Sequence, residues 1–160
     1  MLSFTPDQLR ALQATLASEI PISNAIGLTV VSCDQDGLTL AAPLGPNINH
    51  KDTAFAGSLN AVLTLAGWSL LWLIADAEAI PAKVVIQDSG IRYLRPVTRD
   101  FAARCRMPAP GDVERFLLIL RRKGRARLEL QADIVEDDAI AVAFSGRYVV
   151  QIAAAGLDKF

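Results

Sequence analysis

A stretch of amide, imidazole and carboxylate side chains leads directly into small residues between positions 47 and 58. Asn49, His50 and Asp52 lie in the polar part, and Ala56 and Gly57 follow at the start of a long apolar run. Such a run predicts a helix, whose first backbone N–H groups have no acceptor within the helix and carry partial positive charge. Small residues there let a ligand approach the backbone. The segment therefore suits a carbonyl oxygen that becomes negative during reaction, which makes acyl chemistry the first hypothesis.

Activation of water against an acyl group requires a general base, and two side chains of this segment could supply one. His50 carries an imidazole, a group that exchanges protons near neutral pH, and Asp52 is the nearest carboxylate. Each also has a structural interpretation. His50 could be an exposed loop residue, and Asp52 could be the N-cap or first-turn acid of the helix, which stabilises a helix by about 1 kcal/mol.

Further polar side chains could complete the site. Asn60 and Thr64 are one turn apart on the predicted helix and could hold a water molecule, or they could bond to backbone carbonyls of the same helix. Asp88 interrupts an apolar strand four residues before Arg92. It could serve the site of a partner subunit, or it could form an internal ion pair with Arg92 that fixes the dimer or the strand register.

Two other groups of side chains have both a functional and a structural interpretation. Trp68 and Trp72 cover one face of the long helix and either line an acyl tunnel or pack in the core. A basic cluster comprises Arg121, Arg122, Lys123, Arg125 and Arg127. It could bind the phosphates of coenzyme A or the acidic surface of a carrier protein, or it could be a solvated edge.

Composition narrows the class of protein. The chain has 160 residues, the size of one domain (1–160), and 52% hydrophobic against 21% charged residues predicts a globular chain. A net charge of −1 does not support bulk electrostatic binding of nucleic acid. With a single histidine, the chain lacks the usual ligands of a zinc site, so we expect no metal. Two distant cysteines without a CxxC pair predict reduced thiols and a cytoplasmic location.

The apolar run from Thr53 to Ala75 is roughly long enough to span a bilayer. Polar residues recur along it, at Ser58, Asn60, Thr64 and Ser69. A helix that is apolar all round can also be one enclosed by its own sheet. We therefore expect a buried helix and no membrane partner, and the first residues of the chain do not read as a signal peptide.

The elements that position these residues follow from periodicity and from capping and turn residues. We predict three helices, at Pro6–Ile20, at Thr53–Ala75 and from an Asp112 cap to Gly124. We predict strands at Ile26–Cys33, Leu38–Ala42, Lys83–Arg95, Asp100–Met107, Ala126–Ile134 and Ile140–Ile152, with a bulge at Gly90 in the third of them. Strands that are neighbours in sequence predict the α+β class, with an antiparallel sheet wrapped around one long central helix, the hotdog arrangement.

Several short motifs occur in one order along nearly the whole chain: Asn47-Ile48-Asn49, Thr53 to Leu59, Leu65-Ala66-Gly67-Trp68, Ile91 to Pro96, Arg122-Lys123-Gly124 and Phe144 to Val150. Together they resemble the YiiD C-terminal domain family of the hotdog superfamily, whose members are classed as thioesterases. The resemblance implies a homodimer or tetramer with sites between subunits. It also implies an acyl thioester of coenzyme A or of an acyl carrier protein as substrate, and no cofactor beyond that coenzyme A.

The resemblance also assigns roles to residues. The backbone amides of Ala56 and Gly57 would form the oxyanion hole, with Phe55 and Ser58 beside them as substrate contacts. Asn49 would position the thioester or the attacking water. Apart from the resemblance, the isolated acid Asp88 and the basic residues Arg122 and Lys123 are candidate substrate contacts by their charge.

This chain departs from the family pattern at two places. Related enzymes commonly carry a carboxylate two helical turns after the small residues, where this chain has Thr64, and no acid occurs from Ala61 to Ala75. The family has Asp, Gly and Gly where this chain has His50, Asp52 and Ala56. Three functions therefore remain open: an acyl-thioester hydrolase, a non-catalytic acyl-binding module, and a hydratase or dehydratase that only His50 supports.

Overall fold

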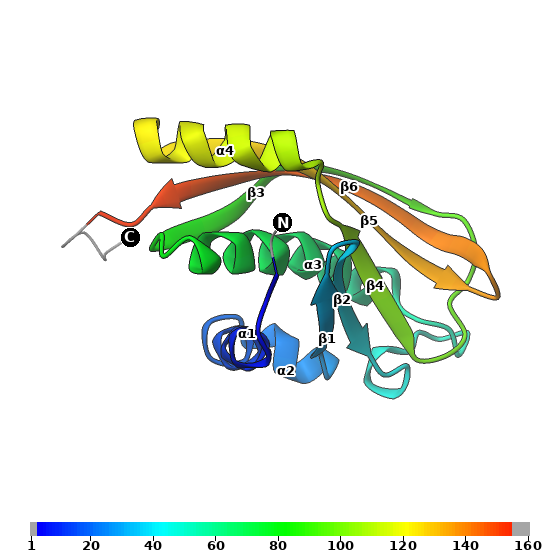
Figure 1. The fold of residues 1–160 in the computed structure, drawn as a ribbon. Coiled ribbons are helices and arrows are strands. Elements are labelled where there is room, and N and C mark those ends of the chain that lie inside the picture. The colour runs from blue at the N-terminus through cyan, green and yellow to red at the C-terminus, as the bar shows by residue number, and fades with distance from the viewer. Residues whose placement is uncertain (1–2, 155–160) are drawn as a thin grey trace.

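The fold is an antiparallel sheet that wraps around one long helix (Figure 1). It was obtained as a computed structural model, in which residues 3–154 are described. The helices are α1 (Pro6–Glu19), α2 (Ile22–Ile26), η1 (Gly45–Asn47), α3 (Ala56–Ala77) and α4 (Pro110–Lys123). The strands are β1 (Thr29–Asp34), β2 (Gly37–Ala42), β3 (Ala82–Tyr93), β4 (Phe101–Arg106), β5 (Arg125–Glu136) and β6 (Ala139–Ile152). Positions 1–2 and 155–160 of the predicted domain lie outside the described residues.

The six strands form one sheet in the order β1-β2-β4-β5-β6-β3, with every neighbouring pair antiparallel. The central helix α3 packs against every strand from β2 to β6, and α1 lies against both α3 and β1. Figure 1 shows α4 over the end of the sheet where β5 begins and β6 ends. The predicted α+β class with one central helix is confirmed.

The core forms around α3 because this helix is apolar on nearly every side. Its buried residues include Leu63, Leu70 and Ile74, which have no exposed surface. In the described part of the chain, α3 is also the single helix long and apolar enough to cross a membrane. However, 67% of the most apolar 18-residue stretch of α3 is buried inside the fold, as expected for a helix enclosed by its own sheet.

One close contact fixes α3 against β6. The Tyr148 side chain is fully buried, and its hydroxyl donates a hydrogen bond of 2.7 Å to the backbone oxygen of Thr64. Burial raises the pKa of Tyr148, so this phenol stays a donor at neutral pH. The ring lies directly against the backbone of Gly67, where a side chain would overlap it. Gly67 therefore sets the distance between α3 and the sheet.

Several predicted boundaries need correction. The segment from Ile26 starts as the end of the short helix α2, so β1 begins only at Thr29. The long helix starts at Ala56 and not at Thr53, because residues 53–55 bond to other segments. α4 is capped at Ala109, and Asp112 lies within its first turn. The bulge in β3 lies between Ile86 and Asp88, and Gly90 keeps a regular pairing.

The two cysteines are free thiols and do not form a disulfide bond. Burial is the main cause that raises the pKa of Cys33 and of Cys105 to about 12. A thiol in that range carries almost no thiolate near neutral pH, and the thiolate is the nucleophile. Neither cysteine is therefore suited to covalent catalysis.

Candidate active site at the start of the central helix

The loop before α3 is held rigidly by two asparagines. Asn47 is buried, and its amide donates to the backbone oxygens of Ile26 at 2.9 Å and Pro43 at 2.7 Å. The Asn49 oxygen accepts from the backbone of Lys51 and Thr53, at 2.8 and 3.3 Å. The Asn49 amide donates to the Thr53 hydroxyl at 2.9 Å. Asn49 therefore shapes its own loop, so we regard it as a positioning residue.

His50, Lys51 and Asp52 form the tip of this loop, and all three are exposed. Asp52 has a φ of 58°, a left-handed conformation that an aspartate tolerates in a tight turn. It lies before the helix cap at Phe55, and the first turn of α3 contains no acid. The interpretation of Asp52 as N-cap or first-turn acid is therefore wrong. Its carboxylate does not cap α3.

The first turn of α3 has no cap from a side chain. The first backbone N–H of the helix with an acceptor is that of Leu59, which bonds to the Phe55 oxygen at 3.1 Å. Among the described residues, the N–H groups of Ala56, Gly57 and Ser58 have no acceptor. Ala56 and Gly57 are also exposed. Three N–H donors at a helix N-terminus, without a competing carboxylate in the turn, have the chemistry to bind an anionic oxygen.

Two aromatic side chains border these donors. The Phe55 ring folds over Gly57, whose missing side chain leaves room for it, yet 55% of Phe55 remains exposed. The Tyr93 hydroxyl, at the end of β3, donates to the Ala56 backbone oxygen at 3.1 Å. Burial raises the pKa of Tyr93, so its hydroxyl keeps the proton that it donates. Tyr93 thus ties the end of β3 to the first turn of α3.

Asn60 and Thr64 follow on the same helix, half-buried, with the Thr64 hydroxyl donating to the Asn60 side-chain oxygen at 3.4 Å. Farther along, Trp68 and Trp72 are half-buried, and both pack against the core and line a pocket. Because these four residues are spaced by four, they form one accessible stripe along α3.

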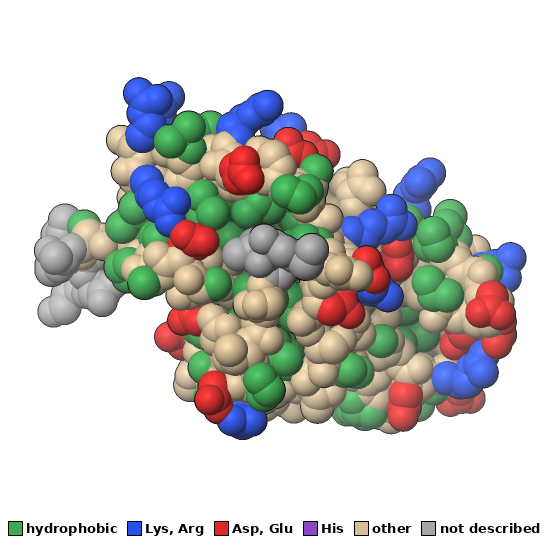
Figure 2. All heavy atoms as spheres, in the orientation of Figure 1, with side chains coloured by type: hydrophobic (Ala, Val, Ile, Leu, Met, Phe, Trp, Pro, Cys, Tyr) green, Lys and Arg blue, Asp and Glu red, His purple; other side chains and the backbone are tan. Residues whose placement is uncertain are grey.

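The remaining predicted substrate contacts lie elsewhere in the protomer. Asp88 is exposed on β3 beside the bulge. Among the described residues of one protomer, Asp88 forms no ion pair with Arg92, so such a pair does not fix the strand register. Arg122 and Lys123 lie in the last turn of α4, where the helix dipole favours positive side chains. Figure 2 shows Lys and Arg side chains gathered over α4. Arg121 pairs with Glu78 at the far end of α3, so this cluster and Ala56 lie at opposite ends of that helix.

Sequence reasoning missed Tyr93 as a neighbour of the helix start, and it missed the anchoring role of Asn47. Both residues lie inside the short motifs on which the family resemblance rests. However, the sequence around each residue does not indicate which distant residue it contacts. The bonding partner of Tyr93 lies 37 positions away, and that of Asn47 lies 21 positions away.

The chain matches a known protein family over most of its length. Residues 9–152 match the family described as "Putative thioesterase (yiiD_Cterm)". The chain is 35% identical to a protein of unknown function from Chlorobaculum tepidum TLS, with a TM-score of 0.88 over 94% of this chain and 99% of that one. It is 32% identical to a "putative thioesterase" from Shewanella oneidensis, with a TM-score of 0.84 over 93% and 100%. A Pseudomonas aeruginosa protein, 18% identical with a TM-score of 0.75 over 90% and 95%, shows likeness of fold alone.

Proposed function

The chain belongs to the YiiD C-terminal thioesterase family of hotdog proteins, and from that premise we propose that it hydrolyses acyl thioesters at the start of α3. One observation carries the proposal. The N–H groups of Ala56, Gly57 and Ser58 have no acceptor among the described residues, and the turn that presents them is exposed. A thioester oxygen gains negative charge when water attacks its carbonyl carbon, and preorganised N–H donors stabilise that charge.

The loop tip supplies the base in this proposal. His50 or Asp52 takes a proton from water, the resulting hydroxide attacks the carbonyl carbon, and the thiolate of coenzyme A or of a carrier protein leaves. Three features support this role: both side chains are exposed, the Asp52 carboxylate is not engaged as a helix cap, and Asn49 holds the loop. Thr64 and Asn60 would hold water or the thioester by hydrogen bonds, because neither can act as a base at neutral pH.

Assembly is a second part of the proposal. β3 is an edge strand of 12 residues that pairs with β6 alone. A long unpaired edge is a template for another strand. We propose that two copies pair through β3 as a homodimer, alone or within a tetramer.

A non-catalytic acyl-binding module is the second candidate, and one observation favours it. Where related enzymes carry a carboxylate on the central helix, this chain has Thr64, and the described part of α3 contains no acid before Asp76. This candidate predicts binding of acyl-coenzyme A without turnover.

The test is thiol release from short, medium, long and aromatic acyl-coenzyme A esters by the purified protein. Loss of a general base is expected to lower kcat by about 10²–10⁴-fold. We therefore expect one of His50→Ala and Asp52→Asn to show that loss, and Lys51→Ala, which changes the exposed residue between them, to keep wild-type turnover. Full turnover in both base variants would contradict the base assignment. Thermal stabilisation by the esters without turnover would favour the binding module.

A further inference from the structure

The helix α4 carries two apolar side chains that are exposed to solvent. The buried residues of this helix, which pack against β5 and β6, are Val113, Phe116, Leu117 and Leu120. Leu118 and Ile119 lie outside that buried set, and 55% and 37% of their surface is exposed. The packing of α4 on the sheet therefore does not account for these two side chains.

Four cations surround this apolar pair. They are Arg115, Arg122, Lys123 and Arg125. All four are exposed, and none forms an ion pair or a side-chain hydrogen bond with another described residue. Arg115 and Arg122 lie one turn before and one turn after the apolar pair on the same helix face. The neighbouring Arg121 differs, because it pairs with Glu78. The four unpaired cations and the apolar pair are called the α4 patch below.

Helix stability explains only part of this charge. Cations are favoured in the last turn of a helix, where Arg122 and Lys123 lie. Arg115 lies in the first half of α4, and Arg125 is already the first residue of β5, so neither gains from the helix dipole. The two acids of α4 both precede Arg115, which leaves the second half of the helix without negative charge. The patch therefore has the chemistry of a binding surface.

The shape of the surface favours a macromolecule over a small ligand. α4 runs beside the first part of β5, where β4 does not pair with that strand. Figures 1 and 2 show α4 as a ridge at the periphery of the fold, with Lys and Arg side chains along it. Small ligands bind mainly in concave pockets. A ridge with apolar residues between cations suits an acidic protein surface, which can cover the one and pair with the other.

Two other occupants fit the α4 patch less well. A second copy packed antiparallel on α4 would bring Arg115 of one copy towards Arg122 of the other, and facing like charges weaken association. A lipid surface binds a helix in proportion to the apolar area that the helix can insert. α4 has already buried most of its apolar residues in its own fold. An acidic protein is therefore the occupant that the patch favours.

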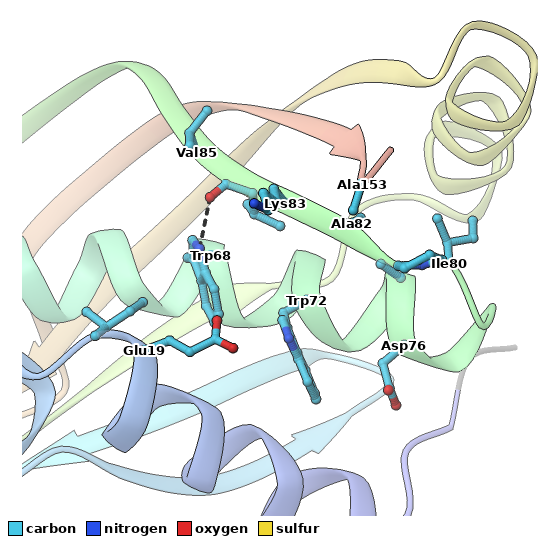
Figure 3. A pocket seen from close by; sticks show the side chains of 13 residues that line it. Glu19, Trp68, Trp72, Asp76, Ile80, Ala82, Lys83, Val85 and Ala153 are labelled. Atoms are coloured by element: carbon cyan, nitrogen blue, oxygen red, sulfur yellow. Dashed lines mark hydrogen bonds between the residues drawn. The ribbon is translucent and has the colours of Figure 1, made fainter. Parts of the chain in front are cut away.

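The α4 patch lies close to the start of β3. Arg125 pairs with Gln151 of β6, and Gln151 pairs with Lys83 of β3. Two strand spacings, about 10 Å, therefore separate the Arg125 backbone from the first residues of β3. Figure 3 shows this end of β3, with the pale yellow ribbon of α4 beyond Ala153.

The homodimer proposed above relates this surface to the α3 amides. Within one copy the two features lie at opposite ends of α3, whose 22 residues span roughly 33 Å. Two β3 edges paired by a twofold axis run antiparallel, so the start of β3 in one copy lies near its end in the other. At that end Tyr93 bonds to Ala56. The α4 patch of one copy and the helix start of its partner therefore lie at the same end of the dimer.

We propose that the α4 patch is the docking surface for an acidic acyl carrier protein that delivers the acyl thioester. The inference rests on the proposed function and selects the carrier protein over coenzyme A as the form in which the substrate arrives. Carboxylates of the carrier pair with the four cations and speed its association. Apolar side chains of the carrier cover Leu118 and Ile119 and slow its dissociation.

Binding is measured with a dye-labelled bacterial acyl carrier protein in its holo form, by fluorescence anisotropy. Arg122→Glu is expected to raise Kd about tenfold at low ionic strength, because it replaces an attraction by a repulsion. Added salt should weaken wild-type binding and reduce this difference. Arg10→Glu is the matched control, since it makes the same charge change at an exposed position of α1 and should leave Kd unchanged.

Leu118→Gln tests the apolar part of the patch and keeps every cation. It should raise Kd at least about threefold at both low and high salt. Ile22→Gln is its control, because Ile22 is 56% exposed against 55% for Leu118 and lies on α2. Wild-type Kd in both Arg122→Glu and Leu118→Gln would overturn the docking surface. No binding of the carrier by the wild-type protein would do the same, and capture by phosphatidylserine vesicles would then assign the patch to a lipid surface.

Turnover shows whether the docked carrier is the substrate. For Arg122→Glu, kcat/KM with the octanoyl carrier protein should fall about tenfold, in step with Kd. The same variant should keep wild-type kcat/KM with octanoyl-coenzyme A, which has no protein surface to dock. An equal fall with both substrates would mean that the patch binds the phosphates of coenzyme A, and would overturn the proposal.

The two proposals can fail separately. Carrier binding that depends on Arg122 and Leu118, without hydrolysis of either thioester, would overturn the proposed hydrolysis and leave the docking surface standing. Hydrolysis of octanoyl-coenzyme A by a protein that does not bind the carrier would overturn the docking surface alone.

Discussion

Ala56→Pro is expected to lower kcat for acyl-coenzyme A hydrolysis by about 10²–10³-fold, the usual cost of removing one oxyanion donor. Proline removes a single N–H group from the proposed site and adds no charge. The fold should tolerate it, because Ala56 is the first residue of α3, the helix position where proline is most favoured. Phe55 already has φ −64° and ψ 130°, a conformation suited to the residue before a proline.

Ala56→Ser is the matched control for this experiment, because it changes the side chain and keeps the N–H group. It should retain turnover within a few-fold of wild type, and both variants should unfold at wild-type denaturant concentrations. Wild-type kcat in the proline variant would mean that the Ala56 amide does not bind the developing oxyanion. Gly57 would then remain as a donor, but the account of three N–H donors would be wrong.

Gly67→Ala is expected to lower the free energy of unfolding by about 3 kcal/mol or more, because the added methyl group overpacks the core. A Cβ at this position would lie 2.3 Å from the Tyr148 hydroxyl oxygen and 2.4 Å from the adjacent ring carbon. The ring cannot move away easily, since Tyr148 is fully buried and bonded to Thr64. The helix must therefore shift away from the sheet, which disturbs packing along its length.

Urea denaturation of Gly67→Ala beside Gly111→Ala measures this effect. Gly111 lies in the first turn of α4, and a Cβ there meets no atom within 4 Å. Its replacement should leave stability unchanged or raise it slightly, because alanine is the better helix former. Equal midpoints for the two variants would show that the contact between Gly67 and Tyr148 is not a constraint on the fold.

Most of the fold follows from periodicity in the sequence. The alternation of buried and exposed residues in β4 and β5 is such a local pattern, and the structure confirms it. The start of α3 differs because residues 53–55 are held by distant partners. The Ala54 N–H bonds to Val97, and the Phe55 N–H bonds to Asn47. Such bonds remove residues from a helix without leaving a local signal.

The free N–H groups of the candidate site could be predicted from the sequence, whereas the contacts of the side chains around them could be predicted only in part. Small residues at the start of the central helix identify the donors, because that inference needs only the helix boundary and the absence of bulky side chains. The roles of Asn49 and Asp88 depend on tertiary geometry. Asn49 uses its side chain on its own loop. Asp88 and Arg92 lie in a stretch of regular pairing after the bulge, yet the described residues contain no ion pair between them.

The central claim is that the thioester carbonyl binds the first amides of α3. A crystal structure with a ketone analogue of octanoyl-coenzyme A, with a methylene in place of sulfur, tests it most directly. The account predicts the ketone oxygen at about 3 Å from the nitrogens of Ala56 and Gly57, the range of an oxyanion hole. An analogue bound with its ketone oxygen away from this turn would contradict the claim, whatever the rate of hydrolysis.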